Sequence, residues 1–245
     1  MEAKNNVKDF FKKFTIFNYI YLIIAYAIII VGFAIGDEKS IFSLITSLMG
    51  VTAFMLSAKG LVVAPIVCSV YYVMYSILSI NQKFYGEAIV NGLIALPIMI
   101  FTIISWFRNK HKQDTTNVQV NNISKKEYLA LIPAIMVVFA GFYFLLRALN
   151  TEQLIVSTFS TVCSTVATYL LMRRSPYYSL GYIIADVLVV SLWTINISTY
   201  GLTYLPTLLS VCCFFVNDVY GFISWQKRKK EQNQIDENEK INQDA

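Results

Sequence analysis

Apolar stretches of about twenty residues follow one another along nearly the whole chain, with only short polar breaks between them. A helix needs roughly 20 mostly apolar residues to cross the roughly 30 Å hydrocarbon core of a bilayer. Hydrophobic residues make up 56% of the 245 and charged residues only 14%, which is too few charges for the surface of a soluble domain. The sequence therefore predicts an all-α polytopic membrane protein. The expected transmembrane helices are residues 14–36, 40–58, 61–80, 84–107, 128–149, 152–172, 176–198 and 201–226.

Most breaks between these eight spans are only a few residues long, so consecutive helices are expected to be antiparallel neighbours. One longer break, residues 108–127, is polar and is expected to form a cytoplasmic loop. The expected organisation is a basic N-terminus with a peripheral helix (1–38), a first three-helix repeat (39–107), the loop (108–127), a linker helix (128–150), a second three-helix repeat (151–226) and a basic, then disordered, cytoplasmic tail (227–245).

The distribution of positive charge predicts the orientation of the chain. All but three of the 20 Lys and Arg residues fall on one side of the eight-span arrangement, the exceptions being Lys39, Lys83 and Arg147. Loops rich in Lys and Arg remain on the cytoplasmic side of a membrane. Both termini are therefore expected in the cytoplasm, and residues 231–245, which have almost nothing to bury, are expected to be disordered.

The chain also contains an internal sequence repeat. Each predicted three-helix unit ends with a Tyr-Gly pair, then a Leu-Pro pair, then an Ile-Ser-Trp triplet. These are Tyr85-Gly86, Leu96-Pro97 and Ile104-Ser105-Trp106 in the first unit, and Tyr200-Gly201, Leu205-Pro206 and Ile223-Ser224-Trp225 in the second. Three spans end on the opposite side from their start, so a second copy in the same orientation needs one extra crossing. The sequence thus predicts a 3+1+3 core of parallel repeats plus one N-terminal helix, an arrangement typical of transporters.

A few polar side chains lie within the apolar spans. A charged side chain at the bilayer centre costs about 2.5–3.5 kcal/mol even on the lenient insertion scale. Such residues are therefore rare in membrane spans unless they serve a function. Asp186 and Asp218 lie deep in their spans, Glu87 lies near the end of one, and Asn91 and Asn217 add amide groups. Such groups suit a ligand with hydroxyls and an amide in an otherwise apolar cavity. Equally, they could serve only to hold helices together.

Aromatic residues within the spans could stack on a planar ring, and a cationic ring would gain about 1–2 kcal/mol more against an aromatic face. Tyr72, Tyr182, Trp193 and Tyr220 lie at suitable depth, although packing against neighbouring helices explains each of them as well. The paired-repeat tryptophans, Trp106 and Trp225, are expected at the membrane interfaces, where amphipathic rings anchor helices.

No motif in the sequence points to catalysis, a metal or a cofactor. The four cysteines fall inside apolar runs and show neither a disulfide framework nor a zinc-ligand spacing. Nucleophile elbows, phosphate-binding glycine loops and metalloprotease helices are absent from the sequence. We therefore expect no enzyme, no cofactor, no metal and no nucleic-acid partner.

Three segments together resemble one family. They are Tyr85-Gly86-Glu87 followed by Asn91, the turn Arg173 to Tyr178 followed by Asp186, and Asn217 to Trp225 before a basic tail. In this order and spacing, from about Lys39 to Lys230, the chain is similar to the PnuC family of bacterial vitamin transporters. The resemblance implies a SWEET-like fold, a homotrimer in the bacterial inner membrane, and uptake of nicotinamide riboside for NAD synthesis. It also implies facilitated diffusion, with the substrate trapped by cytoplasmic phosphorylation.

One departure from the family pattern leaves the substrate open. Members that carry nicotinamide riboside typically have Trp-x-x-Trp entering the seventh span, where this chain has Ser179 and Tyr182, and a Gln of the fourth span is replaced by Met99. Deoxynucleosides or thiamine therefore remain candidate substrates. The residues also permit a proton-coupled carrier using Glu87 and Asp186, or a non-transporting membrane scaffold or sensor. The candidate substrate-binding residues are Asn91, Tyr182, Asp186, Asn217, Asp218 and Tyr220, with Tyr72, Glu87 and Trp193 as further candidates.

Overall fold

The computed structural model describes residues 14–35, 40–81, 88–112, 114–151, 153–200 and 205–244, and its regular elements are helices. The elements are α2 (Ile16–Ile35), α3 (Ile41–Ala58), α4 (Ala64–Asn81), the π-helix η1 (Val90–Ala95), α6 (Leu96–Arg108), α7 (Lys125–Ala148), α8 (Leu154–Met172), α9 (Tyr178–Tyr200) and α10 (Leu205–Asp244). Helices suit a bilayer because each satisfies its own backbone hydrogen bonds.

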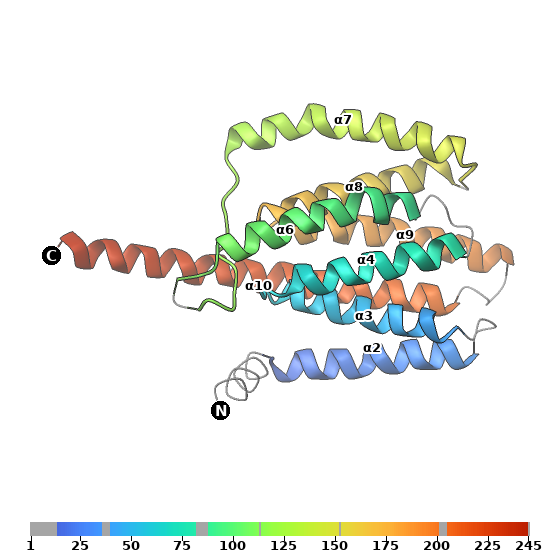
Figure 1. Cartoon of the computed structure of the whole chain (residues 1–245), viewed down its shortest axis with the longest axis horizontal. Helices are drawn as coiled ribbons and strands as arrows, with labels where there is room; N and C mark the ends of the chain where they lie inside the picture. Colours follow the sequence, from blue (N-terminus) through green and yellow to red (C-terminus); the bar gives the residue numbers. More distant parts are fainter. Residues whose placement is uncertain are drawn as a thin grey trace.

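The predicted class, an all-α polytopic membrane protein, is confirmed. Seven of the described helices, with η1 and α6 counted as one, are long and apolar enough to cross a membrane, and α9 adds an apolar stretch over Tyr178–Leu192. Figure 1 shows the helices lying alongside one another, with α2 at one edge and α7 at the opposite edge. Apart from the C-terminal end of α10, which extends well beyond the predicted residue 226, the described helix ends lie within a few residues of the predicted ones, because hydropathy and turn residues are local signals.

Two groups of three helices form the centre of the molecule. The first unit consists of α3, α4 and η1–α6, and the second unit consists of α8, α9 and α10; within each unit consecutive helices pack on each other. The units meet where α6 packs on α8 and where α10 packs on α3. Outside them, α2 lies against α3 and α10, while α7 packs chiefly on α8.

Trp106 and Trp225 lie between the two units, near the ends of α3 and α8, and because both are buried against protein the prediction that they anchor the chain at the membrane surface is wrong. Both side chains are fully buried, and their ring centroids are 5.7 Å apart. The indole of Trp106 donates to the carbonyl of Leu171 at 3.0 Å, and that of Trp225 donates to the carbonyl of Ser57 at 3.0 Å. Each unit therefore caps the first helix of the other, and these bonds provide the partner that a buried indole N–H requires.

Matching turns follow the two capped helices. Gly60 after α3 and Arg174 after α8 both adopt positive φ, 59° and 60°. In each turn the next amide closes a six-residue loop, with Leu61 N donating to Leu56 O and Ser175 N donating to Leu170 O. This is the Schellman motif that satisfies the last carbonyls of a helix.

The long polar loop joins both turns. Val118 N donates to Gly60 O at 3.0 Å, and Asn121 N donates to Arg174 O at 3.0 Å. Val118 is fully buried, so the loop is held against the ends of both units.

The structure continues α10 as a helix to Asp244, where a disordered tail is expected from the composition. Gln232 explains the first part of this extension. Its side chain is buried, accepts from Val120 N at 2.8 Å and donates to Val118 O at 3.4 Å. The loop thus holds the helix beyond the basic block, and the Glu, Gln and Lys residues that follow favour helix.

Candidate functional site

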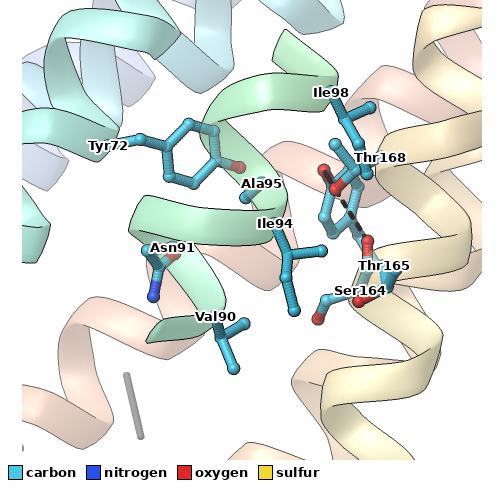
Figure 2. Close-up of a pocket in the computed structure, with 10 residues that line it drawn as sticks. Tyr72, Val90, Asn91, Ile94, Ala95, Ile98, Ser164, Thr165 and Thr168 are labelled. Atoms are coloured by element: carbon cyan, nitrogen blue, oxygen red, sulfur yellow. Dashed lines mark hydrogen bonds between the residues drawn. The ribbon is translucent and has the colours of Figure 1, made fainter. Parts of the chain in front are cut away.

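A small, mainly apolar cavity with a few polar groups lies where the two units meet. It is enclosed by α4, η1–α6, α8 and α9 and has a volume of about 50 Å³, which is room for a few water-sized molecules. The lining residues are Tyr72, Val90, Asn91, Ile94, Ala95, Ile98, Ser164, Thr165, Thr168 and Tyr182 (Figure 2). Three of the predicted candidates, Tyr72, Asn91 and Tyr182, are thereby brought together from three helices.

The π-helix η1 positions Asn91. The amide of Leu96 donates to the carbonyl of Asn91, five residues earlier, in place of the usual four. Pro97 follows directly and has no N–H to donate to Leu93, so the ordinary helical ladder is interrupted at this point. A β-carbon at Gly92 would lie 3.1 Å from the hydroxyl of Ser76, which shows how closely η1 approaches α4. Wide turns of this kind are rare and occur frequently at functional sites.

Hydroxyl groups of α8 form the opposite wall, across from Tyr72 and Asn91 (Figure 2). Ser164, Thr165 and Thr168 each donate to the carbonyl one turn earlier, at 2.8 to 3.0 Å. Because each hydroxyl has a single proton, its oxygen faces the cavity as an acceptor. None of these three residues is among the candidates expected from the sequence. Their signal is the recurrence of Ser and Thr at helical spacing within an otherwise apolar span.

Tyr182 connects this wall to the second unit. Its hydroxyl and that of Thr168 are 2.8 Å apart, and since Thr168 already donates to its own helix, Tyr182 is the donor. The Tyr182 ring also packs edge-on against Tyr178, with centroids 6.1 Å apart. Its hydroxyl further interacts with that of Tyr72. Two tyrosine rings thus stand at the cavity, one from each unit.

Asp186 and Asp218 form a second polar cluster, next to the cavity. Asp186 follows Tyr182 by one turn of α9, and its carboxyl group lies within hydrogen-bonding reach of the carboxyl group of Asp218 on α10. The amide of Asn217 also contacts Asp218, and Asn217 is only 1% exposed. Asp186 Oδ2 and Asn217 Oδ1 are buried with no hydrogen-bond partner among the described residues.

The remaining candidates lie elsewhere. Tyr220 faces α2, where its hydroxyl donates to Asn18 Oδ1 at 3.4 Å and its ring stacks on Phe17 at 4.9 Å. It does not line the cavity. Trp193 lies in α9, but its side chain is outside the described residues, as is Glu87.

Features of a catalytic or metal centre are not expected from the sequence. Among the described residues, no group of three His, Cys, Asp or Glu side chains could hold a metal ion. The four cysteines, Cys68, Cys163, Cys212 and Cys213, are free thiols.

Of the positions that depart from the family pattern, Ser179 is fully buried beside Gly221, and Met99 is buried in the hydrophobic core.

The molecule is a bundle of helices long and apolar enough to cross a membrane, with a small cavity between two groups of three helices, an arrangement typical of polytopic membrane transporters. Residues 40–227 match the family model described as nicotinamide mononucleotide transporter. The chain belongs to this family, the PnuC family. It is 24% identical over 226 residues to the nicotinamide riboside transporter PnuC of Neisseria mucosa, covering 91% of this chain and 86% of that protein. The crystal structure of the vitamin B3 transporter PnuC matches with a TM-score of 0.74 and 24% identity, covering 89% of this chain and 94% of that one.

These relatives are named as transporters, so the chain is a bacterial membrane transporter and not an enzyme. The similarity to the crystal structure confirms the all-helical membrane fold.

Proposed function

We propose that this chain imports nicotinamide riboside by facilitated diffusion, and that the substrate is trapped by cytoplasmic phosphorylation and used for NAD synthesis. The observation that carries the proposal is the cavity between the two units, which combines an amide, several hydroxyl acceptors and two tyrosine rings. A riboside with a carboxamide-bearing ring presents hydroxyls, an amide and a planar face in return. The name of the Neisseria relative agrees with this substrate.

The family model is named for the mononucleotide and the relative for the riboside, and these compounds differ by one phosphate. Among the described residues that line the cavity there is no Lys or Arg. A phosphate group needs such a partner when it is removed from water. The riboside is therefore the better match to this cavity.

In the proposed arrangement, the 3+1+3 parallel repeats move relative to each other around the cavity, and both termini are cytoplasmic. A volume of about 50 Å³ is too small for a nucleoside, so substrate entry requires the units to part. Asn91, Tyr72 and Tyr182 contact the substrate directly, while Asp186, Asn217 and Asp218 act from the adjoining cluster. Tyr220 contributes by holding α10 against α2.

We also propose that three copies assemble in the membrane. The outward face of α7 supports this, because it carries several large exposed apolar side chains and packs on little besides α8. Mass measurement of the purified protein in detergent or nanodiscs tests the trimer.

Uptake into proteoliposomes tests the transport function. Radiolabelled nicotinamide riboside, nicotinamide mononucleotide, deoxyadenosine and thiamine are offered separately, the last two because Ser179 and Tyr182 replace the usual tryptophans. Saturable uptake of nicotinamide riboside that persists after the pH gradient is collapsed is expected. The variant Asn91→Leu should lose this uptake, while Asn122→Leu, the same change at an exposed loop position, should keep it. No saturable uptake of any compound would favour a scaffold or sensor instead.

A further inference from the structure

The acidic cluster of Asp186, Asp218 and Asn217 lies near the middle of the membrane. Asp186 is eight residues into α9 from Tyr178, and Asp218 is nine residues before Lys227 on α10. At about 1.5 Å per residue, each carboxyl group is some 12–14 Å from the same end of the bundle. Gln226 Nε2 donates to Pro176 O at 3.4 Å, which holds those two helix ends at one level.

Two carboxyl groups at this depth favour a positively charged partner whenever one of them is ionised. A hydrogen bond between them requires one proton, because an ionised carboxylate can only accept. With one shared proton the pair keeps one negative charge, which is costly in a low-dielectric environment unless a cation compensates it. Among the described residues, no Lys or Arg interacts with either carboxyl group.

Asn217 provides independent evidence that a ligand binds here. It is 99% buried, as its 1% exposure shows, and its amide contacts Asp218, yet its Oδ1 has no described partner. Asp186 Oδ2 is likewise buried and has no hydrogen-bond partner among the described residues. A buried acceptor without a partner costs about 1–3 kcal/mol, so two of them beside a negative charge favour a ligand that donates and is positively charged.

The neighbouring polar groups do not satisfy these acceptors. Tyr21 of α2 donates its hydroxyl to the carbonyl of Cys213 at 2.9 Å, and Tyr182 of α9 donates to Thr168. Arg228, a basic residue further along α10, binds the carbonyl of Lys59 at the end of α3. The hydroxyls of these two nearby tyrosines are therefore bonded elsewhere and leave the oxygens of the cluster available.

We propose that Asp186, Asp218 and Asn217 form a cation-selecting site, which binds the positively charged ring of the substrate and favours monocationic over neutral or phosphorylated compounds. This inference rests on the proposed transport function and adds a basis for its selectivity. A monocation neutralises the pair, a neutral nucleoside leaves its charge uncompensated, and a phosphate adds repulsion.

The test compares nicotinamide riboside with its reduced form, which has the same sugar and amide on an uncharged dihydropyridine ring. Binding and uptake are measured with the full chain in nanodiscs and proteoliposomes. The wild type should bind the cation at least about ten-fold more tightly than the reduced form. Equal affinity for the two compounds would overturn the inference while leaving transport intact. No binding of either compound would overturn the proposed function, and the inference with it.

The double variant Asp186→Asn/Asp218→Asn preserves the shape of the cluster and removes its charge. It should bind the cation about thirty-fold or more weakly than the wild type does and the reduced form as well as before. Each single variant keeps one carboxylate and should retain most of the preference. Glu231→Gln, which removes an exposed carboxylate from the same helix, is the matched control and should change nothing. A folded double variant that still prefers the cation would contradict the proposal; if it does not fold, the wild-type comparison decides.

Discussion

The two three-helix units share a backbone plan but differ in where they leave space. Counted from the paired tryptophans, Ala95 on η1 corresponds to Phe214 on α10, and counted from the matching turns, Thr168 on α8 corresponds to Phe54 on α3. Ala95 and Thr168 line the cavity. Phe54 and Phe214 instead pack edge to face at 5.2 Å and close the equivalent space. Side-chain volume, together with the π-turn of η1, therefore distinguishes the side with this cavity from the closed side.

Polar groups differ between the units in the same way. Asp186 on α9 corresponds to Tyr72 on α4, and the Asn217–Asp218 pair corresponds to Ile98 and Met99. The first unit thus supplies an aromatic ring and apolar walls where the second supplies an amide and two carboxyl groups. The first unit forms the same arrangement of three helices without these polar groups. Their presence in the second unit is therefore better explained by a ligand than by folding.

Filling the cavity should have the largest effect. Ala95→Phe copies the arrangement of the closed side, and we expect uptake of nicotinamide riboside to fall by about a hundred-fold or more, equivalent to about 2.7 kcal/mol. Leu93→Phe places a ring on the same π-helix, but Leu93 is 72% exposed, so its uptake should match the wild type. Unchanged uptake in a folded Ala95→Phe protein would show that the substrate does not pass this cavity.

Removing a ring from the closed side, where Phe54 and Phe214 pack together, should reduce stability without affecting transport. Phe54→Ala removes a ring that contacts both Tyr71 and Phe214, and a partly buried Phe→Ala change should destabilise the protein by about 2–3 kcal/mol. Thermal unfolding in detergent measures the loss, with the outward-facing Phe101→Ala as control. New or altered substrate selectivity in Phe54→Ala would mean that both sides can serve as a site.

Replacing the two tryptophans one at a time tests how equivalent the units are. Trp106→Phe and Trp225→Phe each keep a ring but leave a buried carbonyl, of Leu171 or Ser57, without its donor. Each should destabilise the protein by about 1–3 kcal/mol, and by similar amounts, since the two bonds have equal length. Thermal unfolding of both variants measures this, and a clear difference between them would show that one inter-unit contact dominates.

Breaking the ion pair between the second unit and α7 should have the smallest effect. Arg173 Nε and Nη2 donate to the two carboxylate oxygens of Glu127 at 2.6 and 2.8 Å, tying α7 to the end of α8. Lys59, at the matching position of the first unit, forms no ion pair with a described residue. Because Arg173 is 40% exposed, Glu127→Gln should cost less than about 1 kcal/mol. The loss should shrink in high salt, and a salt-independent loss would indicate a buried role.

Some of the site could be predicted from single residues and some could not. Asn91, Tyr72 and Tyr182 stand out as polar or amphipathic groups in apolar spans. The hydroxyls of Ser164 and Thr168 do not stand out, because such residues commonly bond within their own helix.

The Leu-Pro pairs of the two repeats do not occupy equivalent positions in their units. Pro97 lies nine residues before Trp106 and produces a π-turn within a span, whereas Pro206 lies nineteen residues before Trp225, in the first turn of α10. At the start of a helix, a missing N–H has no consequence. The same dipeptide therefore has different structural effects in the two units, and only their positions relative to the tryptophans reveal it.

The sequence by itself determined the membrane class, the spans and, apart from the C-terminal end of α10, their described ends, because hydropathy and turn chemistry act over a few residues and add along a helix. Tertiary structure decided which faces meet: that Trp106 and Trp225 are buried against each other, that Tyr220 turns towards α2, and that Asp186 and Asp218 touch. Those outcomes depend on how each helix is rotated about its axis, and packing between segments far apart in the chain sets that rotation.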